Sequence, residues 1–153
     1  MASSSVKPNF DASDPSTFKH MTYLPQQAQT YSPPLIANSN AYLGDVLSST
    51  TLLSTIAKSS SSSTDDKRGP LSAGFFHLHA GEPLEYTYTY DEMKLVLEGE
   101  FTITDLVAGS KVRAGKGDTF FFPKGSKLKF ECTSEGGEPA KAFFVGGRDE
   151  GVL

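Results

Sequence analysis

The second half of the chain alternates hydrophobic and polar residues over short stretches, starting at about Leu71. Glycine, proline and aspartate separate these stretches at nearly regular intervals. They read SAGFFHLHA, EYTYTY, MKLVLEGEFTITDLV, DTFFFP, KLKFEC and AKAFFVGG. A period of two is typical of strands with one buried face, and regularly spaced turns between short strands favour a barrel or sandwich. We therefore predict that this half holds an all-β barrel.

The first half contains less regular segments. Prolines interrupt residues 1–34, so we expect an irregular N-terminal arm there rather than a long helix or a central strand. Residues 35–153 are predicted to form one domain, to which residues 35–47 can supply a strand. The apolar residues 52–57 suit a further strand or one helical turn. The serine-rich and charged stretch 58–69 has no hydrophobic period and is expected to be a flexible surface loop.

Composition excludes several classes of function. A length of 153 residues suits one domain, and a net charge of −4 without a basic cluster argues against nucleic-acid binding. No apolar run approaches the ~20 residues of a membrane-spanning helix, and MASSSVKPNF lacks the apolar core of a signal peptide. The single cysteine, Cys132, cannot form an internal disulfide. We expect a cytoplasmic protein with no membrane partner.

Two spaced motifs stand out among the predicted strands. In YDEMKLVLEGE, Glu92 is followed by six residues and then Gly99. In GDTFFFPKG, Gly117 is followed by five residues, Pro123, one residue and Gly125. The glycines permit tight turns with unusual backbone angles, and the proline ends a strand.

These motifs resemble the closing half of the first cupin motif and the opening half of the second. The sequences FPKG and YDEMKLVLEGEFTI are most similar to the EutQ-like small cupins of ethanolamine utilization, over roughly residues 72–146. The resemblance implies a single-domain cupin jelly-roll β-barrel with an interior that can hold a small molecule. It also implies a homodimer, since cupin barrels commonly pair through their sheets.

The usual cupin metal ligands are absent from this chain. The resemblance places two histidines shortly before Glu92, but those positions hold Glu85 and Thr87 with one spacing, or Tyr86 and Tyr88 with the other. The third histidine position falls on Leu128. We therefore predict no metal and no cofactor.

His77 and His79 offer another route to a metal site. They lie two residues apart in FFHLHA, so both side chains of a strand would point to one face. Facing the barrel interior, they could join Glu92 as two imidazoles and a carboxylate. Two alternatives stay open: polar contacts to a substrate without metal, and simple exposure on the outside.

Tyr86, Tyr88 and Tyr90 alternate with threonines, which puts all three phenols on one face of a regular strand. Inside the barrel they would supply hydroxyl groups that orient a carbonyl or donate a proton. Outside it, they would form a stripe for dimer packing.

Lys94 follows Glu92 by two residues and should share its face, while Met93, Leu95 and Leu97 pack on the other. A lysine beside a glutamate inside an apolar cavity either forms a buried ion pair or acts as a base. The third possibility is a lysine that reaches to the mouth of the barrel.

These residues suggest an enzyme acting by metal-independent proton transfer on an organic carbonyl or enolisable substrate, such as an isomerase, lyase, dehydratase or cyclase. The candidate catalytic residues are Glu92, Lys94, Tyr88, His77 and His79. The candidate substrate-binding residues are Tyr86, Tyr90, Phe120, Phe122, Leu128 and Phe130, which would give a cavity with few polar groups. A non-catalytic binding or accessory cupin and a metal-dependent cupin using the histidine pair are the alternatives.

Overall fold

The structure is a computed structural model that describes residues 21–50 and 69–153. Most of the predicted arm, the segment 52–57 and nearly all of the predicted loop 58–69 lie outside the described residues. The elements are α1 (Gln27–Thr30), β1 (Leu35–Ala37), β2 (Ala41–Ser48), β3 (Ser72–Leu78), β4 (Leu84–Thr87), β5 (Glu92–Glu98), β6 (Glu100–Asp105), β7 (Lys111–Gly115), β8 (Thr119–Phe122), β9 (Lys127–Cys132), the 3-10 turn η2 (Glu135–Gly137) and β10 (Ala140–Gly146).

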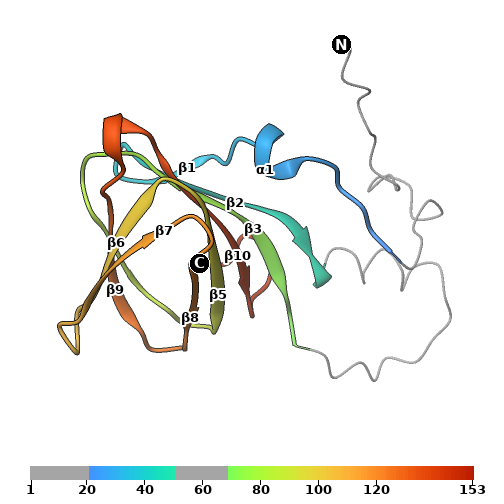
Figure 1. Ribbon diagram of the computed structural model, residues 1–153. Coiled ribbons are helices and arrows are strands. Elements are labelled where there is room, and N and C mark those ends of the chain that lie inside the picture. The colour runs from blue at the N-terminus through green and yellow to red at the C-terminus, as the bar shows by residue number, and fades with distance from the viewer. Residues whose placement is uncertain (1–20, 51–68) are drawn as a thin grey trace, which may run out of the picture.

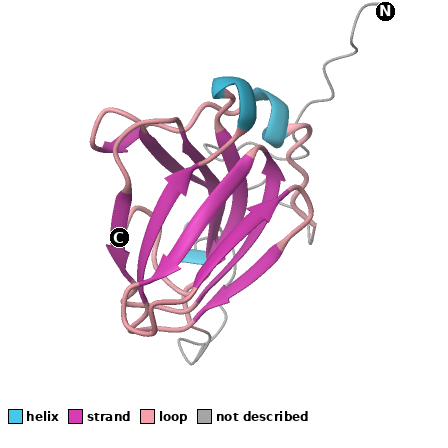
Figure 2. Cartoon of the chain, turned by 60° about the vertical axis from the view of Figure 1, so that its left-hand side comes forward, coloured by secondary structure: helices cyan, strands magenta, loops and turns pink. Residues whose placement is uncertain are grey.

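The strands form two antiparallel sheets that face one another, as Figures 1 and 2 show. The larger sheet has the order β1-β2-β3-β10-β5-β8, and the smaller has the order β4-β9-β6-β7. This mostly β, cupin-like architecture confirms the predicted fold class. The expected strand at 35–47 is in fact two strands, β1 and β2, because the chain turns at Asn38, whose φ is 53°.

The described part of the N-terminal segment, residues 21–34, contains only the short helix α1. Tyr31 follows this helix, and its ring centroid lies 6.0 Å from that of Phe75 on the large sheet. Gly44 on β2 permits the close approach, since a Cβ atom there would overlap the Tyr31 hydroxyl and the ring of Pro34. This segment therefore packs against β2 and β3.

Strand β5 shows the predicted alternation. Glu92, Lys94 and Val96 are buried, whereas Met93 and Leu95 are exposed. A strand turns successive side chains to opposite faces, so one face of β5 enters the space between the sheets and the other faces outward. The predicted shared face of Glu92 and Lys94 is thus confirmed.

Aromatic rings fill much of the space between the sheets. Phe76 of the large sheet stacks on Phe101 of the small sheet, with ring centroids 5.7 Å apart, and meets Phe130 edge to face at the same centroid distance. Such contacts between facing sheets bury large apolar area and hold the two layers together. The polar site described below lies within this aromatic core.

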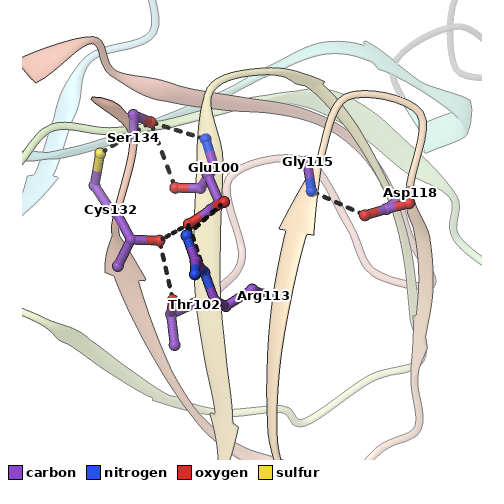
Figure 3. Close-up of polar contacts among 8 residues, drawn as sticks. Glu100, Thr102, Arg113, Gly115, Asp118, Cys132 and Ser134 are labelled. Carbon is purple, nitrogen blue, oxygen red and sulfur yellow. Dashed lines mark hydrogen bonds and ion pairs between the residues drawn. The ribbon is translucent and has the colours of Figure 1, made fainter. Parts of the chain in front are cut away.

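The motif glycines occupy turns that require them. Gly99 has a φ of +68° and Gly125 a φ of +95°, both in the left-handed region that favours glycine. Asp118, next to Gly117, accepts a hydrogen bond of 2.8 Å from the backbone N–H of Gly115 and closes the turn before β8 (Figure 3). Pro123 directly follows the last residue of β8.

A cluster of polar side chains ties the strands of the small sheet together (Figure 3). Arg113 of β7 donates two hydrogen bonds to the Glu100 carboxylate of β6. The Thr133 hydroxyl also donates to this carboxylate, at 2.7 Å, and lies 3.0 Å from the Thr102 hydroxyl. The hydrogen bonds of Thr133 and Arg113 lower the pKa of the partly exposed Glu100 carboxyl. The cluster fastens β7 and the end of β9 to β6.

Candidate functional site

A small cavity of about 30 Å³ lies between the sheets. Its walls come from strands that are far apart in sequence, namely β1, β2, β3, β4, β5 and β9. The lining residues are Ile36, Leu43, Phe76, Leu84, Tyr86, Tyr88, Tyr90, Glu92, Lys94, Phe130 and Leu153. Hydrocarbon and aromatic carbon therefore surround a few polar groups.

Glu92 and Lys94 form a buried ion pair in this cavity. The Lys94 ammonium lies 2.9 Å from Glu92 Oε1, and the two residues are 4% and 2% exposed. The Tyr88 hydroxyl donates a hydrogen bond of 2.7 Å to the same carboxylate oxygen. Of the alternatives for Lys94, the structure shows the buried ion pair.

Three aromatic rings surround the Lys94 ammonium. Its nitrogen lies 4.9 Å from the centroid of Phe76, 5.2 Å from that of Phe144 and 5.9 Å from that of Phe130. The negative faces of aromatic rings attract a cation, and the attraction grows when water is excluded. The rings and Glu92 together compensate for the loss of hydration that a buried ammonium suffers.

The three tyrosines all line the cavity, as one of the two predicted arrangements required. The Tyr86 hydroxyl lies 3.4 Å from the Tyr90 hydroxyl, and the rings of Tyr86 and Tyr88 meet edge to face at 4.8 Å. Burial raises the pKa of Tyr88 above its ordinary value, and the neighbouring Glu92 carboxylate raises it further. Burial and the hydrogen bond with Tyr86 likewise raise the pKa of Tyr90. Both phenols are therefore neutral hydrogen-bond donors at ordinary pH.

Beyond Tyr90 lies a second buried ion pair, which the sequence analysis missed. Arg148 donates two hydrogen bonds of 2.8 Å to the two carboxylate oxygens of Asp45, and its guanidinium carbon lies 5.4 Å from the Tyr90 ring centroid. Burial acts to raise the pKa of Asp45, but the hydrogen bonds and charge of Arg148 and the N–H of Gly151 lower it overall. The pair joins β2 to the segment after β10 and supports the ring of Tyr90.

The two histidines lie away from the cavity. His77 alternates with Phe76 and Leu78, which face the core, so it points to the outer face of β3. Burial lowers the pKa of His77, and the positive charge of Lys141 lowers it further. His79 is exposed after the end of β3 and meets the Tyr42 ring edge to face at 5.2 Å. The structure does not bring either histidine to Glu92, because the strand register gives the interior face to the apolar residues.

Only part of the predicted apolar lining borders the cavity. Phe130 lines the cavity, whereas Phe120, Phe122 and Leu128 pack in or against the core beside it. Sequence reasoning missed several lining residues: Ile36, Leu43, Phe76, Leu84 and Leu153. The sequence shows that Phe76 lies on the opposite face of its strand from His77, but not which of the two faces the interior.

Within residues 21–50 and 69–153, no group of three or more histidine, cysteine, aspartate or glutamate side chains is arranged to hold a metal ion. The position of the third usual cupin histidine holds Leu128, which is buried among apolar side chains. The same described ranges contain no helix long and apolar enough to cross a membrane.

The sequence model of a family described as "Ethanolamine utilisation protein EutQ" matches residues 53–144, more than half of the chain. The chain belongs to the EutQ family. The predicted resemblance to EutQ-like cupins is thus confirmed.

Two curated relatives carry the name "Acetate kinase EutQ". The protein from Escherichia coli K12 is 37% identical over 71 residues, which cover 46% of this chain and 29% of the relative. The protein from Clostridioides difficile 630 is 41% identical over 46 residues, which cover 30% of this chain and 28% of the relative. The matched segment therefore spans less than a third of each curated relative.

Solved structures agree on the fold. The crystal structure of ethanolamine utilization protein Q from Salmonella typhimurium LT2 has a TM-score of 0.51 and 24% identity, covering 72% of this chain and 71% of that one. The cupin domain of Cnp3 from Schizosaccharomyces pombe has a TM-score of 0.50 and 13% identity, covering 71% of this chain and 65% of that one.

The relatives' names correct the predicted function. They describe an acetate kinase of ethanolamine utilisation, whereas the sequence analysis expected a proton-transfer isomerase, lyase, dehydratase or cyclase. That expectation was wrong. The reason is that an acid, phenols and an ammonium inside a barrel suit many reactions and do not specify one.

Proposed function

We propose that this EutQ-family chain serves the acetate kinase chemistry of ethanolamine utilisation, with the barrel cavity as the pocket that binds acetate. The observation that carries the proposal is the Lys94 ammonium in a small, mostly apolar cavity. The ammonium and the tyrosine hydroxyls would bind the carboxylate. The side chains of Leu43 and Leu84 would contact the methyl group.

The size of the cavity supports a ligand of a few heavy atoms. A water molecule needs about 10–15 Å³ of such volume, so about 30 Å³ holds about two to three water-sized groups. An acetate ion fits this space after small movements of the lining, whereas a nucleotide is far too large for it. In this proposal the nucleotide binds outside the cavity, and the barrel contributes selectivity for the acyl group.

The donors in the cavity support a ligand with two oxygen acceptors. A lysine ammonium has three N–H donors, of which Glu92 accepts one. Tyr86 and Tyr90 place two further hydroxyl groups on the cavity wall. A carboxylate bound close to Glu92 would share a proton with it, because two neighbouring carboxylates in an apolar site do not both stay ionised. Acetate binding should therefore take up a proton and weaken as the pH rises.

Isothermal titration calorimetry of the full chain with sodium acetate tests the binding step. We expect saturable binding of acetate, weaker binding of the bulkier butyrate, and binding of acetate that weakens between pH 5.5 and pH 8 by up to about tenfold per pH unit, the slope expected for uptake of up to one proton. Lys94→Met should abolish binding. Lys141→Met is the matched control, since Lys141 is also paired with a glutamate but on the outer surface. Butyrate binding as tightly as acetate would contradict the size argument.

The phosphoryl-transfer step is tested separately by coupled assays, with acetate and Mg-ATP in one direction and acetyl phosphate and Mg-ADP in the other. We expect turnover in the wild type and in Lys141→Met, and none in Lys94→Met. Acetate binding without turnover would limit the proposal to a binding role. The absence of both acetate binding and turnover in the folded wild-type protein would overturn the proposal.

A further inference from the structure

We propose that Lys94 is also a site of reversible covalent capture, at which its amine forms an imine with a short aliphatic aldehyde. The inference goes beyond the proposed function, because it needs only the cavity and the ion pair, not acetate binding or phosphoryl transfer. It concerns a neutral ligand, whose binding needs no uptake of a proton, whereas a carboxylate bound beside Glu92 does.

The cavity gives a small aldehyde direct access to the amine. Both Lys94 and Glu92 line it, and the other lining groups are aliphatic or aromatic apart from the tyrosine hydroxyls. A neutral two- or three-carbon aldehyde loses little hydration on entry and gains apolar contacts. The aldehyde carbonyl can accept a hydrogen bond from a tyrosine hydroxyl while its carbon approaches the nitrogen.

Glu92 is placed to move the protons that the reaction needs. Its Oε1 lies 2.9 Å from the Lys94 nitrogen, within reach for direct proton transfer. The ammonium gives one proton to Glu92, and the free amine attacks the carbonyl carbon, forming the C–N bond. A proton moves from nitrogen to the former carbonyl oxygen. Glu92 then returns its proton to the hydroxyl group, water leaves, and a protonated imine remains beside the carboxylate.

Charge conservation favours this modification over acylation of the same amine. The ammonium and the protonated imine both carry one positive charge, so the pair with Glu92 and the contacts with the rings of Phe76 and Phe144 persist. An amide at this nitrogen would be neutral and would leave the Glu92 carboxylate buried without a counter-charge, which is strongly unfavourable. The site therefore accommodates an aldehyde without losing its electrostatic balance.

Tyr88 assists as a positioning residue. Its hydroxyl donates to the same carboxylate oxygen that faces Lys94, at 2.7 Å, and its raised pKa keeps it a donor. This hydrogen bond fixes the carboxylate in the orientation that proton transfer requires.

Lys141 provides an internal control in the same molecule. It pairs with Glu98 at 3.1 Å, so it also has a neighbouring carboxylate, but it lies on the outer surface with about a quarter of its side chain exposed. Lys94 lies in the apolar cavity among aromatic rings, whereas Lys141 lies outside it. A comparison of their labelling rates thus isolates the effect of the site.

The experiment traps the imine by reduction. The full chain is incubated with acetaldehyde and sodium cyanoborohydride, and peptide mass spectrometry follows the gain of an ethyl group at each lysine. We expect Lys94 to react about a hundredfold faster than Lys141, the low end of what positioned acid–base catalysis contributes. Glu92→Gln should remove this advantage without changing the rate at Lys141, and Tyr88→Phe should reduce it.

Wild-type protein alone decides the question if the variants do not fold, because the modified lysine is identified directly. Ethylation only at exposed lysines, with Lys94 unmodified, would overturn the proposal. The result is separate from the proposed function: acetate binding without Lys94 labelling contradicts only this inference, and Lys94 labelling without acetate binding contradicts only the acetate pocket. If both hold, saturating acetate should slow labelling of Lys94 and leave Lys141 unaffected.

Discussion

Lys94 and Glu92, two residues apart on β5, form an ion pair of 2.9 Å inside the barrel, where both are almost completely buried. Burying two charges costs several kcal/mol each before their attraction is counted. Here the Tyr88 hydroxyl and three aromatic rings add to that attraction. Stability should therefore depend strongly on whether the pair is broken or replaced as a unit.

Removing one partner of this pair should destabilise the protein more than removing both. Glu92→Gln leaves a buried ammonium without its counter-charge, and Lys94→Met leaves a buried carboxylate. Each should lower the free energy of unfolding by about 3–5 kcal/mol. The double variant should lose less than about 2 kcal/mol, since it buries no unpaired charge. Urea unfolding of the four proteins measures the coupling between the two residues.

Additive losses in the double variant would contradict the electrostatic account, because they would mean that each residue stabilises the fold independently. Lys141→Met serves as a control here too. Its pair with Glu98 is partly exposed, and exposed pairs contribute about 0–1 kcal/mol.

The face of β5 was predictable from sequence because its alternation is unambiguous. Glu92, Lys94 and Val96 have to share a face, and the apolar Met93 and Leu95 share the other. Which face enters the barrel followed from the motif glutamate. Strand β3 offered no such anchor: both of its faces carry phenylalanine, so the pattern alone did not decide whether His77 or Phe76 points inward.

The rest of the site depends on contacts between distant parts of the chain. Arg148 and Asp45 are 103 residues apart, and neither belongs to a recognisable motif. Leu153 and Ile36 reach the cavity from segments whose placement depends on the completed sheets. Local spacing predicts strands and turns, but it contains no information on which side chains meet after the sheets have assembled.

The ion pair of Asp45 and Arg148 should make stability fall in acid. The pKa of Asp45 is lowered in the folded protein, so the unfolded chain binds more protons in this range and stability rises with pH. The contribution is complete above the ordinary value of about 3.9 and is lost as the pH falls through the lower folded value. Asp45→Asn should cost about 3–5 kcal/mol at pH 7 by leaving Arg148 unpaired, and this difference should shrink below about pH 4.

Thermal or urea unfolding from pH 2.5 to 8 measures this effect. Glu131→Gln is a suitable control, because its contact with Lys129 is long, at 3.8 Å, and about a third of its side chain is exposed. We expect that variant to differ from the wild type by less than about 0.5 kcal/mol. An Asp45→Asn difference that stays constant down to pH 2.5 would show that the carboxylate charge is not what stabilises the pair.

The two motif glycines should respond differently to alanine. Both have positive φ, which costs a non-glycine residue about 1–3 kcal/mol. At Gly99 an added Cβ would also lie 2.6 Å from the carbonyl oxygen of Pro139, whereas at Gly125 nothing lies within 4 Å. Gly99→Ala should therefore destabilise the fold more than Gly125→Ala. Equal losses in urea unfolding would mean that the backbone at Pro139 moves to accommodate the methyl group.

The outer face of the large sheet leads to a proposal about the assembly state. Met93 lies between Phe121 on β8 and Val145 on β10 in the strand register, so apolar side chains form a row across three strands. Leu95 begins a second row beside Phe143. Met93 is 62% exposed and Phe121 56% exposed in the single chain. Contiguous apolar surface of this kind is uncommon on monomers, and we propose that a second copy covers it in a two-fold homodimer.

Light scattering coupled to size exclusion should give twice the chain mass of 16.4 kDa. Leu95→Glu should yield monomers, because a two-fold interface would bring two carboxylates into one apolar contact. Val112→Glu is the matched control, since Val112 is an exposed apolar residue on β7 of the other sheet. A dimer that survives Leu95→Glu but not Val112→Glu would move the interface to the small sheet. A wild-type monomer at high concentration would contradict the homodimer itself, because an apolar sheet face that binds a second copy gains association free energy in proportion to the area removed from water.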